Sequence, residues 1–198
     1  MTRHAPSRHP SPGARRGGRP RLASAAAAAV LLGAVSVTGC GQDPRPERPA
    51  AVTEFNENGV TVRLSVADWN ASAGTLVATF TPDETGFHLY STTLPPQGVE
   101  GVGRPTGVRP TGTVTAAGRL TVDAPVRNIT VPGVRSALPV YPDGPVTATL
   151  PIRATSAGEA KVLISYASCS STAGCTIPVA DRAVALHTSG DSLTFGSG

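Results

Sequence analysis

The chain has 198 residues and a formal net charge of +4, with an apolar share of 39% and an aromatic share of only 4%. The positive charge is concentrated at the N-terminus, because six of the seventeen basic residues precede Leu22 and no acidic residue occurs before Asp43. From Cys40 onward the chain has eleven basic and thirteen acidic residues. The overall positive charge is therefore no argument for a nucleic-acid-binding domain. The 22 glycines and 19 prolines argue against a helical bundle and favour short strands joined by turns.

Residues 1–39 are typical of a signal peptide. An arginine-rich segment precedes residues 22–37, which are small or apolar and uncharged but too short for a bilayer-spanning helix of about 20 residues. The run ends in Val37-Thr38-Gly39-Cys40, which resembles the lipobox of bacterial lipoproteins. That resemblance implies removal of residues 1–39 and lipidation of Cys40, so that the protein is anchored at the extracytoplasmic face of the cell membrane. An ordinary cleaved signal peptide with a chance cysteine is the alternative.

Residues 40–51 are predicted to be the lipidated cysteine and a tether. Residues 41–51 contain three prolines and several charges, a composition that favours extended polyproline geometry. We expect residues 52–198 to form one domain with its own core.

The pattern of this domain predicts an all-β fold. Val60, Val62, Leu64 and Val66 alternate with more polar residues, which is the period of a half-buried strand. Glycine-, proline- or aspartate-containing turns separate most of the predicted strands, and the dense prolines of residues 95–145 favour edge strands or bulges. Short strands at this spacing predict an immunoglobulin-like β-sandwich. The predicted strands are 60–66, 76–80, 88–91, 108–115, 119–122, 126–131, 146–154, 161–166, 182–186 and 192–195.

Two cysteines follow Cys40, and five small residues separate Cys169 from Cys175. In an exported protein such a pair can form a disulfide. As a structural staple it would be weak, because closing a seven-residue ring stabilises by only about 2.4 kcal/mol, against about 4.7 kcal/mol for a hundred-residue loop. The small neighbours leave the sulfurs approachable, but no Lys, Arg or His lies beside them to lower a thiol pKa. A redox pair activated by a group that the fold brings near, and a structural disulfide, both remain open.

Other chemistry-bearing residues have simpler interpretations. Asp83-Glu84 follows Pro82 at a strand end and is interpreted as a solvated turn rather than an acid–base pair. His88 is interpreted as a half-buried strand residue. A metal site built from both cysteines and His187 would have poor zinc spacing, so we expect no metal.

Residues 160–186 resemble a known family. Their strand, Tyr166, Cys169, Cys175, Pro178 and return strand are similar to the N-terminal periplasmic domain of the disulfide-interchange reductase DsbD. Thr79-Phe80-Thr81 followed by Gly86-Phe87-His88-Leu89-Tyr90-Ser91 resembles that family's strand and Gly-aromatic-aromatic-Leu-Tyr turn. Residues 148–152 (ATLPI) resemble its Leu-Pro-Val strand. The resemblance extends over about residues 52–186.

The resemblance implies an immunoglobulin-like sandwich with a redox-active Cys-x5-Cys hairpin. Cys175 matches the cysteine that forms a mixed disulfide with a partner, and Cys169 matches its resolving mate. The implied surroundings of the pair are Tyr166, Pro178, Phe87 and Tyr90. Thiol–disulfide exchange is the only chemistry required, so no cofactor is implied.

The implied partners are a membrane dithiol electron carrier, which reduces the pair, and extracytoplasmic thioredoxin-like proteins, which the pair reduces. In the family this serves disulfide isomerisation or cytochrome c maturation, and the protein would be a thiol–disulfide oxidoreductase. The family chain usually continues into a membrane domain and a thioredoxin-like domain, so here we expect the reductant to be a separate polypeptide. The alternative is a lipid-anchored binding or scaffold module with a structural disulfide.

One segment departs from the family pattern. Well-known members carry an acidic and aromatic cap loop that shields the disulfide. The equivalent residues 132–141 (PGVRSALPVY) contain no acidic residue, and Tyr141 is their only aromatic. The sequence therefore does not predict a shielding cap.

Overall fold

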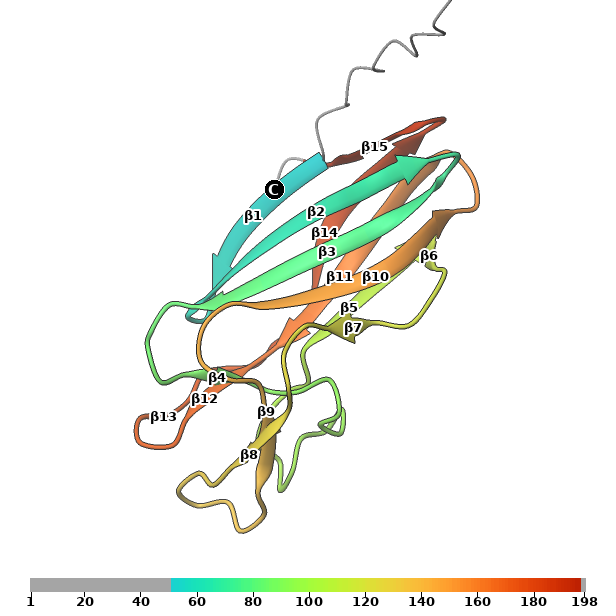
Figure 1. The fold of residues 1–198 in the computed structure, drawn as a ribbon. Coiled ribbons are helices and arrows are strands. Elements are labelled where there is room, and N and C mark those ends of the chain that lie inside the picture. Colours follow the sequence, from blue (N-terminus) through green and yellow to red (C-terminus); the bar gives the residue numbers. More distant parts are fainter. Residues whose placement is uncertain (1–50, 197–198) are drawn as a thin grey trace, which may run out of the picture. The chain divides into compact units, whose positions relative to one another are not determined.

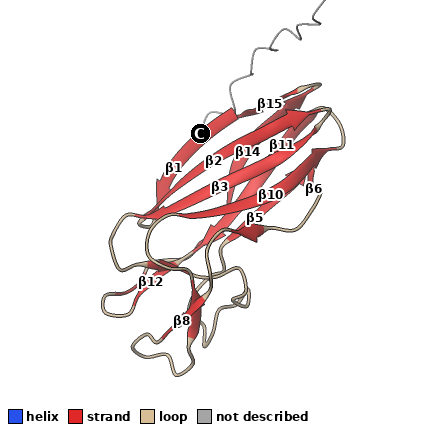
Figure 2. Ribbon diagram, in the orientation of Figure 1, coloured by secondary structure: helices blue, strands red, loops and turns tan. Residues whose placement is uncertain are grey.

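The computed structural model of the protein describes residues 51–196, whose regular elements are all β-strands (Figures 1 and 2). The predicted signal peptide, the predicted lipidation site Cys40 and the predicted tether up to residue 50 lie outside the described residues. Within residues 51–196 no helix is long and apolar enough to span a membrane. The prediction of an all-β fold is confirmed.

Two antiparallel sheets make up most of the domain. In the first sheet the strands pair in the order β1-β2-β3-β10-β6, and β7 also pairs with β10. In the second the order is β15-β14-β11-β5. The strands of the first sheet are β1 (Ala51–Glu57), β2 (Val60–Asn70), β3 (Ala73–Pro82), β6 (Val114–Ala116), β7 (Thr121–Val122) and β10 (Val146–Ala154). Those of the second are β5 (Gly107–Gly112), β11 (Gly158–Tyr166), β14 (Val179–Ser189) and β15 (Ser192–Phe195).

The two sheets share one hydrophobic core, which makes them the layers of an immunoglobulin-like sandwich. The predicted alternation in β2 is confirmed, because Val60, Val62, Leu64 and Val66 are all buried. Residues of β3, β10, β11 and β14 supply most of the rest of this main core, with single residues from β4, β5, β6 and β15 and Tyr141. Burial of alternate side chains of each strand is the main stabilising contribution, at about 25 cal/mol per Å² of apolar surface.

Five short strands lie at one end of the sandwich. They are β4 (His88–Leu89), β8 (Arg127–Ile129), β9 (Leu138–Val140), β12 (Ser168–Ser170) and β13 (Gly174–Cys175). β12 pairs with both β13 and β4, and β8 pairs with β9. A bridge between Tyr90 and Val140, with a hydrogen bond from the Tyr141 amide to the Leu89 carbonyl, joins β4 to β9. The strands therefore form a continuous ladder, β13-β12-β4-β9-β8, which Figure 1 shows at the end opposite the β14–β15 turn.

The chain crosses between the two sheets at Gly112. The predicted strand 108–115 is divided there into β5, which pairs with β11, and β6, which pairs with β10. Gly112 has a φ of 80°, and a Cβ atom on it would lie 3.0 Å from the Glu159 carbonyl oxygen. Only glycine accommodates both requirements without strain.

Four strands were not predicted from the sequence: β1, β9, β12 and β13. In β1 the half-buried positions include Thr53 and Glu57, so the apolar alternation is interrupted. In β12 all three residues, Ser168, Cys169 and Ser170, are buried despite their small or polar side chains. Ala51, expected to end the tether, is the first residue of β1.

We predict that Tyr166→Phe destabilises the domain without affecting its cysteines. The Tyr166 hydroxyl donates a 2.8 Å hydrogen bond to the Glu57 carbonyl oxygen, and its ring packs edge-to-face on Phe80. Removing the hydroxyl leaves the ring contact in place and loses one hydrogen bond, worth about 1 kcal/mol. Urea unfolding measures the loss, and an unchanged midpoint would contradict the assignment.

Candidate functional site

A tight hairpin carries the two cysteines. Cys169 in β12 lies directly opposite Cys175 in β13, and a disulfide joins them. The Ser170 hydroxyl oxygen accepts hydrogen bonds from the backbone amides of Thr172 and Ala173, which close the turn. The disulfide therefore ties off a single turn and links no distant strands.

The base of this hairpin is held independently of the disulfide. The Thr176 amide donates to the Ser168 carbonyl at 2.9 Å, and the Ser168 amide donates to the Thr176 hydroxyl oxygen at 3.1 Å. The Asn58 side chain, in the turn between β1 and β2, donates to the Ile177 carbonyl at 3.0 Å. The first two bonds join the arms of the hairpin, the third fixes it to the sandwich, and none of them involves a sulfur atom.

The two cysteines differ in exposure. Cys169 is 0% exposed, whereas Cys175 is exposed. Pro178, two residues beyond Thr176, is exposed, and Ile177 is 74% exposed, among the most exposed large apolar side chains of the described residues. A thiolate from outside can therefore approach the Cys175 sulfur, and its attack would expel the sulfur of Cys169.

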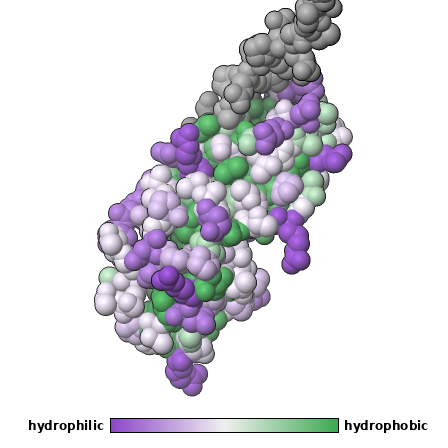
Figure 3. Space-filling model, in the orientation of Figure 1, coloured by the Kyte–Doolittle hydropathy of each residue, from purple (hydrophilic) through white to green (hydrophobic). Residues whose placement is uncertain are grey.

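Cys169 belongs to a second, smaller core, which we call the end core. Its buried residues come from β9, β12 and the loops beside them, including the position directly after β4. On the face drawn in Figure 3, apolar residues at this end of the domain lie among hydrophilic ones. The end core consists of Tyr90, Leu94, Val131, Leu138, Val140, Ala167 and Cys169.

Tyr90 connects the end core to the sulfur of Cys175. Its hydroxyl lies 3.3 Å from Sγ of Cys175, and because a disulfide sulfur can only accept, the phenol is the donor. Burial raises the pKa of Tyr90 to about 12, so the hydroxyl stays protonated at neutral pH. Gly103 makes room for the ring, since a Cβ atom there would lie 2.8 Å from Cζ of Tyr90.

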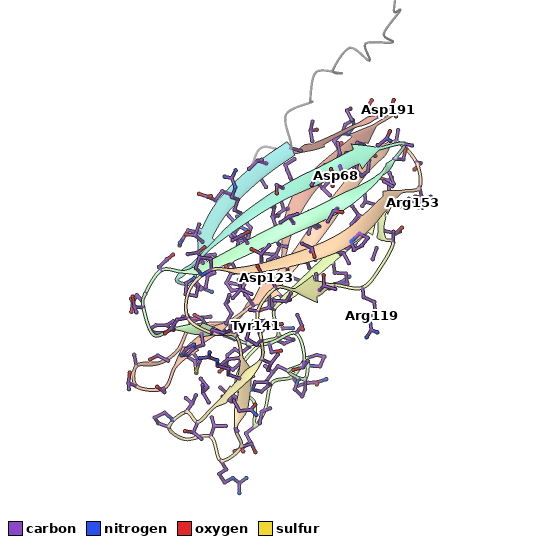
Figure 4. The ribbon with its side chains drawn as sticks, viewed as in Figure 1. Asp68, Arg119, Asp123, Tyr141, Arg153 and Asp191 are labelled. Atoms are coloured by element: carbon purple, nitrogen blue, oxygen red, sulfur yellow. A yellow bond between two sulfur atoms is a disulfide. The ribbon has the colours of Figure 1, made fainter. Side chains whose placement is uncertain are left out.

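Residues 132–141 contribute to the end core. Residues 138–140 form β9, and Leu138 and Val140 are buried against Cys169. Tyr141 belongs instead to the main core, where its hydroxyl accepts a hydrogen bond from the Thr92 amide (Figure 4). The segment thus covers Cys169, while Cys175 stays exposed.

Glu100, from a neighbouring loop, fastens this segment. Its carboxylate accepts hydrogen bonds from the Ser136 hydroxyl at 2.9 Å, the Ser136 amide at 3.0 Å and the Arg135 amide at 3.3 Å. The Ser136 hydroxyl, followed by the Arg135 amide, holds the pKa of Glu100 below its usual value. Glu100 thus belongs to a different loop from residues 132–141, and its carboxylate contacts the backbone of residues 135–136.

The structure brings together only some of the predicted site residues. Cys169, Cys175 and Tyr90 are in contact, and Pro178 follows the hairpin. Phe87 is half-buried in the turn before β4, where its amide bonds to the Glu84 carbonyl. Tyr166 lies in the main core, and its hydroxyl bonds to Glu57 rather than to a cysteine.

The sequence missed the position of His88 relative to the cysteines. His88 is a half-buried strand residue, as interpreted, but in the β4–β12 ladder it lies directly opposite Cys169. Its Nδ1 atom is 3.4 Å from Oδ1 of Asp143, in the turn after β9. Because 81 positions separate His88 from Cys169 in the chain, only knowledge of the strand pairing could have revealed this.

The remaining candidates have structural roles. Asp83 accepts hydrogen bonds from Asn56 at 2.8 Å and from Thr61 at 3.1 Å, so it fastens the β1–β2 hairpin. His187 pairs with Glu159 at 2.7 Å on β14 and β11. Within residues 51–196 there is no cluster of three or more His, Cys, Asp or Glu residues that could hold a metal ion.

Comparison with known proteins identifies the fold. No family model and no curated protein matches the chain. The structure is similar to the N-terminal periplasmic domain of ScsB from Proteus mirabilis, with a TM-score of 0.51 and 15% identity over 70% of this chain. The match covers 51% of that chain, so this protein spans about half of its length. The Neisseria meningitidis DsbD N-terminal domain in its reduced form also matches, with a TM-score of 0.41 and 12% identity over 68% of this chain and 89% of that chain.

These findings agree with the predicted fold class. The chain is all-β and forms an immunoglobulin-like sandwich with a Cys-x5-Cys hairpin, and it shares the fold of the ScsB domain. At 15% identity the likeness establishes the fold alone.

We predict that Tyr90→Phe slows the reaction of Cys175 in the reduced protein. The phenol would stabilise a Cys175 thiolate, and a hydrogen bond to a charged group is worth about 1.5 kcal/mol at the low end of its range, which is about tenfold in thiolate population. Iodoacetamide alkylation at pH 7, read by mass spectrometry in a Cys40→Ser background, should be about five- to tenfold slower. Tyr141→Phe is the matched control, because that hydroxyl bonds to Thr92. Equal rates for all three proteins would contradict a role for Tyr90 at the site.

Proposed function

We propose that the protein performs thiol–disulfide exchange outside the cytoplasm through Cys169 and Cys175. The observation that carries the proposal is the unequal exposure of two bonded cysteines in one tight hairpin, with the outer sulfur accessible and the inner one enclosed. The fold shared with a periplasmic domain supports the extracytoplasmic location. Ring closure over so few residues stabilises the fold only modestly, which suits a bond that is opened and closed.

The exchange proceeds in two steps. The Cys175 thiolate of the reduced protein attacks a disulfide of a thioredoxin-like partner, forming a mixed disulfide and releasing the partner's other sulfur as a thiolate. The Cys169 thiolate then attacks Cys175, which reforms the internal disulfide and releases the reduced partner. Two electrons and two protons pass to the partner. A membrane dithiol carrier would return them by the same chemistry in reverse.

The hydroxyl of Tyr90 would assist at the outer sulfur. It lies at hydrogen-bond distance from Cys175 and remains a donor at neutral pH. A donor at this position favours the Cys175 thiolate, and a thiolate is both the better nucleophile and the better leaving group.

A lipid anchor on Cys40 would hold the domain near a membrane carrier. The lipobox-like sequence Val37-Thr38-Gly39-Cys40 supports this, and two or three acyl chains anchor stably at about 0.8 kcal/mol per buried methylene. The segment before β1 would then serve as the tether.

We predict that Cys40→Ala moves the protein from the membrane fraction to the soluble fraction of a bacterial expression host. Labelled palmitate should be incorporated by the unmodified chain and by Cys175→Ser. The Cys175→Ser variant is the control, because it also loses a cysteine but keeps Cys40. Retention of Cys40→Ala in the membrane pellet would contradict lipid anchoring.

A pair of single-cysteine variants tests the proposed exchange, with Cys40→Ser as background. In Cys169→Ser the remaining thiol is exposed, and in Cys175→Ser it is buried. We expect Cys169→Ser to displace thionitrobenzoate from an activated single-cysteine thioredoxin at least tenfold faster than Cys175→Ser. The difference follows from access and from the cost of forming a thiolate in an apolar environment. Equal rates would contradict the assigned roles.

The reduction potential distinguishes exchange from the alternative, a binding or scaffold module with a structural disulfide. We expect a potential above about −300 mV, since structural disulfides of exported proteins lie below that value. A redox titration with thiol trapping measures it. A value well below this limit would favour the binding module.

A further inference from the structure

The exchange requires a charge at a buried position. When an external thiolate attacks Cys175, the sulfur of Cys169 leaves as a thiolate. That sulfur belongs to the end core, whose other members are apolar residues and Tyr90, and Cys169 is 0% exposed. A buried anion without a partner is strongly unfavourable, and apolar surroundings raise a thiol pKa. Rapid exchange therefore needs a proton donor beside Cys169.

His88 lies at the corresponding position across the ladder. Residues directly opposite in an antiparallel pair place their side chains on the same face, with Cβ atoms about 5 Å apart. Cys169 is opposite Cys175 on one side and opposite His88 on the other. Tyr90, two residues after His88 and therefore on the same face, reaches Sγ of Cys175. One face of β13-β12-β4 thus carries Cys175, Cys169 and His88 in a row.

Asp143 completes this arrangement. Its Oδ1 atom lies 3.4 Å from Nδ1 of His88, and the histidine side chain is 21% exposed. The carboxylate lies at ion-pair distance on one edge of the ring and restrains the ring's orientation. The titratable groups around His88 are therefore Asp143 from the turn after β9, Cys169 from β12 and, further along the same face, Cys175 from β13 and Tyr90 directly after β4. Tyr90 keeps its proton at neutral pH, and imidazole is the side chain best suited to exchange one there.

We propose that His88, paired with Asp143, gives a proton to the Cys169 thiolate as the disulfide opens and takes it back when Cys169 attacks the mixed disulfide. The proposal rests on the proposed exchange function. In the opening step the S–S bond between Cys169 and Cys175 breaks, and a bond forms between Cys175 and the attacking sulfur. The proton moves from the imidazolium to Cys169, leaving a neutral ring and a thiol. The closing step reverses each of these changes.

The test is the pH profile of disulfide reduction by dithiothreitol in the full chain with Cys40→Ser. The rate constant is expressed per dithiothreitol thiolate, so that titration of the reductant is removed. For the unmodified site we expect it to rise at least tenfold from pH 8.5 to pH 5.5, since a hydrogen bond to a charged group is worth at least about tenfold in rate. In His88→Gln the profile should be flat. His187→Gln, which removes a histidine also paired with a carboxylate, should keep the rise.

A second variant covers the case in which His88→Gln does not fold, which circular dichroism would reveal. Asp143→Asn changes an exposed turn residue, and the rise should become smaller because the carboxylate no longer orients the ring. A rise that is the same in Asp143→Asn and in any folded His88→Gln as in the unmodified site overturns the role of His88 while leaving exchange intact. Failure of dithiothreitol to reduce the unmodified site at any pH would instead overturn the proposed function.

Discussion

The pairing of β12 on both of its edges is the constraint on which the site depends. As the middle strand between β13 and β4, β12 places Cys169 inside the end core, with Cys175 on one side and His88 on the other. The residues of the end core enclose Cys169, whereas Cys175 lies in the edge strand β13 and is exposed. The two cysteines have similar small neighbours in the sequence. Their unequal exposure therefore comes from the order of the strands.

The end core depends on loops that the sandwich does not need. Residues 91–106 and the β8–β9 hairpin contribute no strand to either large sheet, yet they cover the inner sulfur and support Tyr90. Gly103 permits the close approach to Tyr90, and the Glu100 carboxylate fastens the two loops together through Ser136. The main core thus provides the stability of the domain, and the end core provides the environment of the cysteines.

The sequence predicted the sandwich well and the site in part. Strands with apolar alternation, such as β2, β10 and β15, could be predicted because nearly all their inward residues are Val, Leu, Ile or Phe. β12 could not be predicted in this way. The buried hydroxyl groups of Ser168 and Ser170 are satisfied by hydrogen bonds to Thr176 and Thr172, and a hydropathy pattern does not indicate such bonds. The cysteine pair was singled out from its spacing and small neighbours, and Tyr90 was identified by resemblance. His88 was not assigned to the site because contact across a ladder depends on register, which local patterns do not specify.

The bonds at the base of the hairpin have a consequence for the exchange proposed above. The bonds among Thr176, Ser168, Asn58 and Ile177 involve no sulfur atom, so opening the disulfide breaks none of them. In the proposed exchange, the oxidised and reduced domains would then present nearly the same outline to a partner. Release after each transfer would follow from the covalent exchange itself, and donor and acceptor would use one surface in turn.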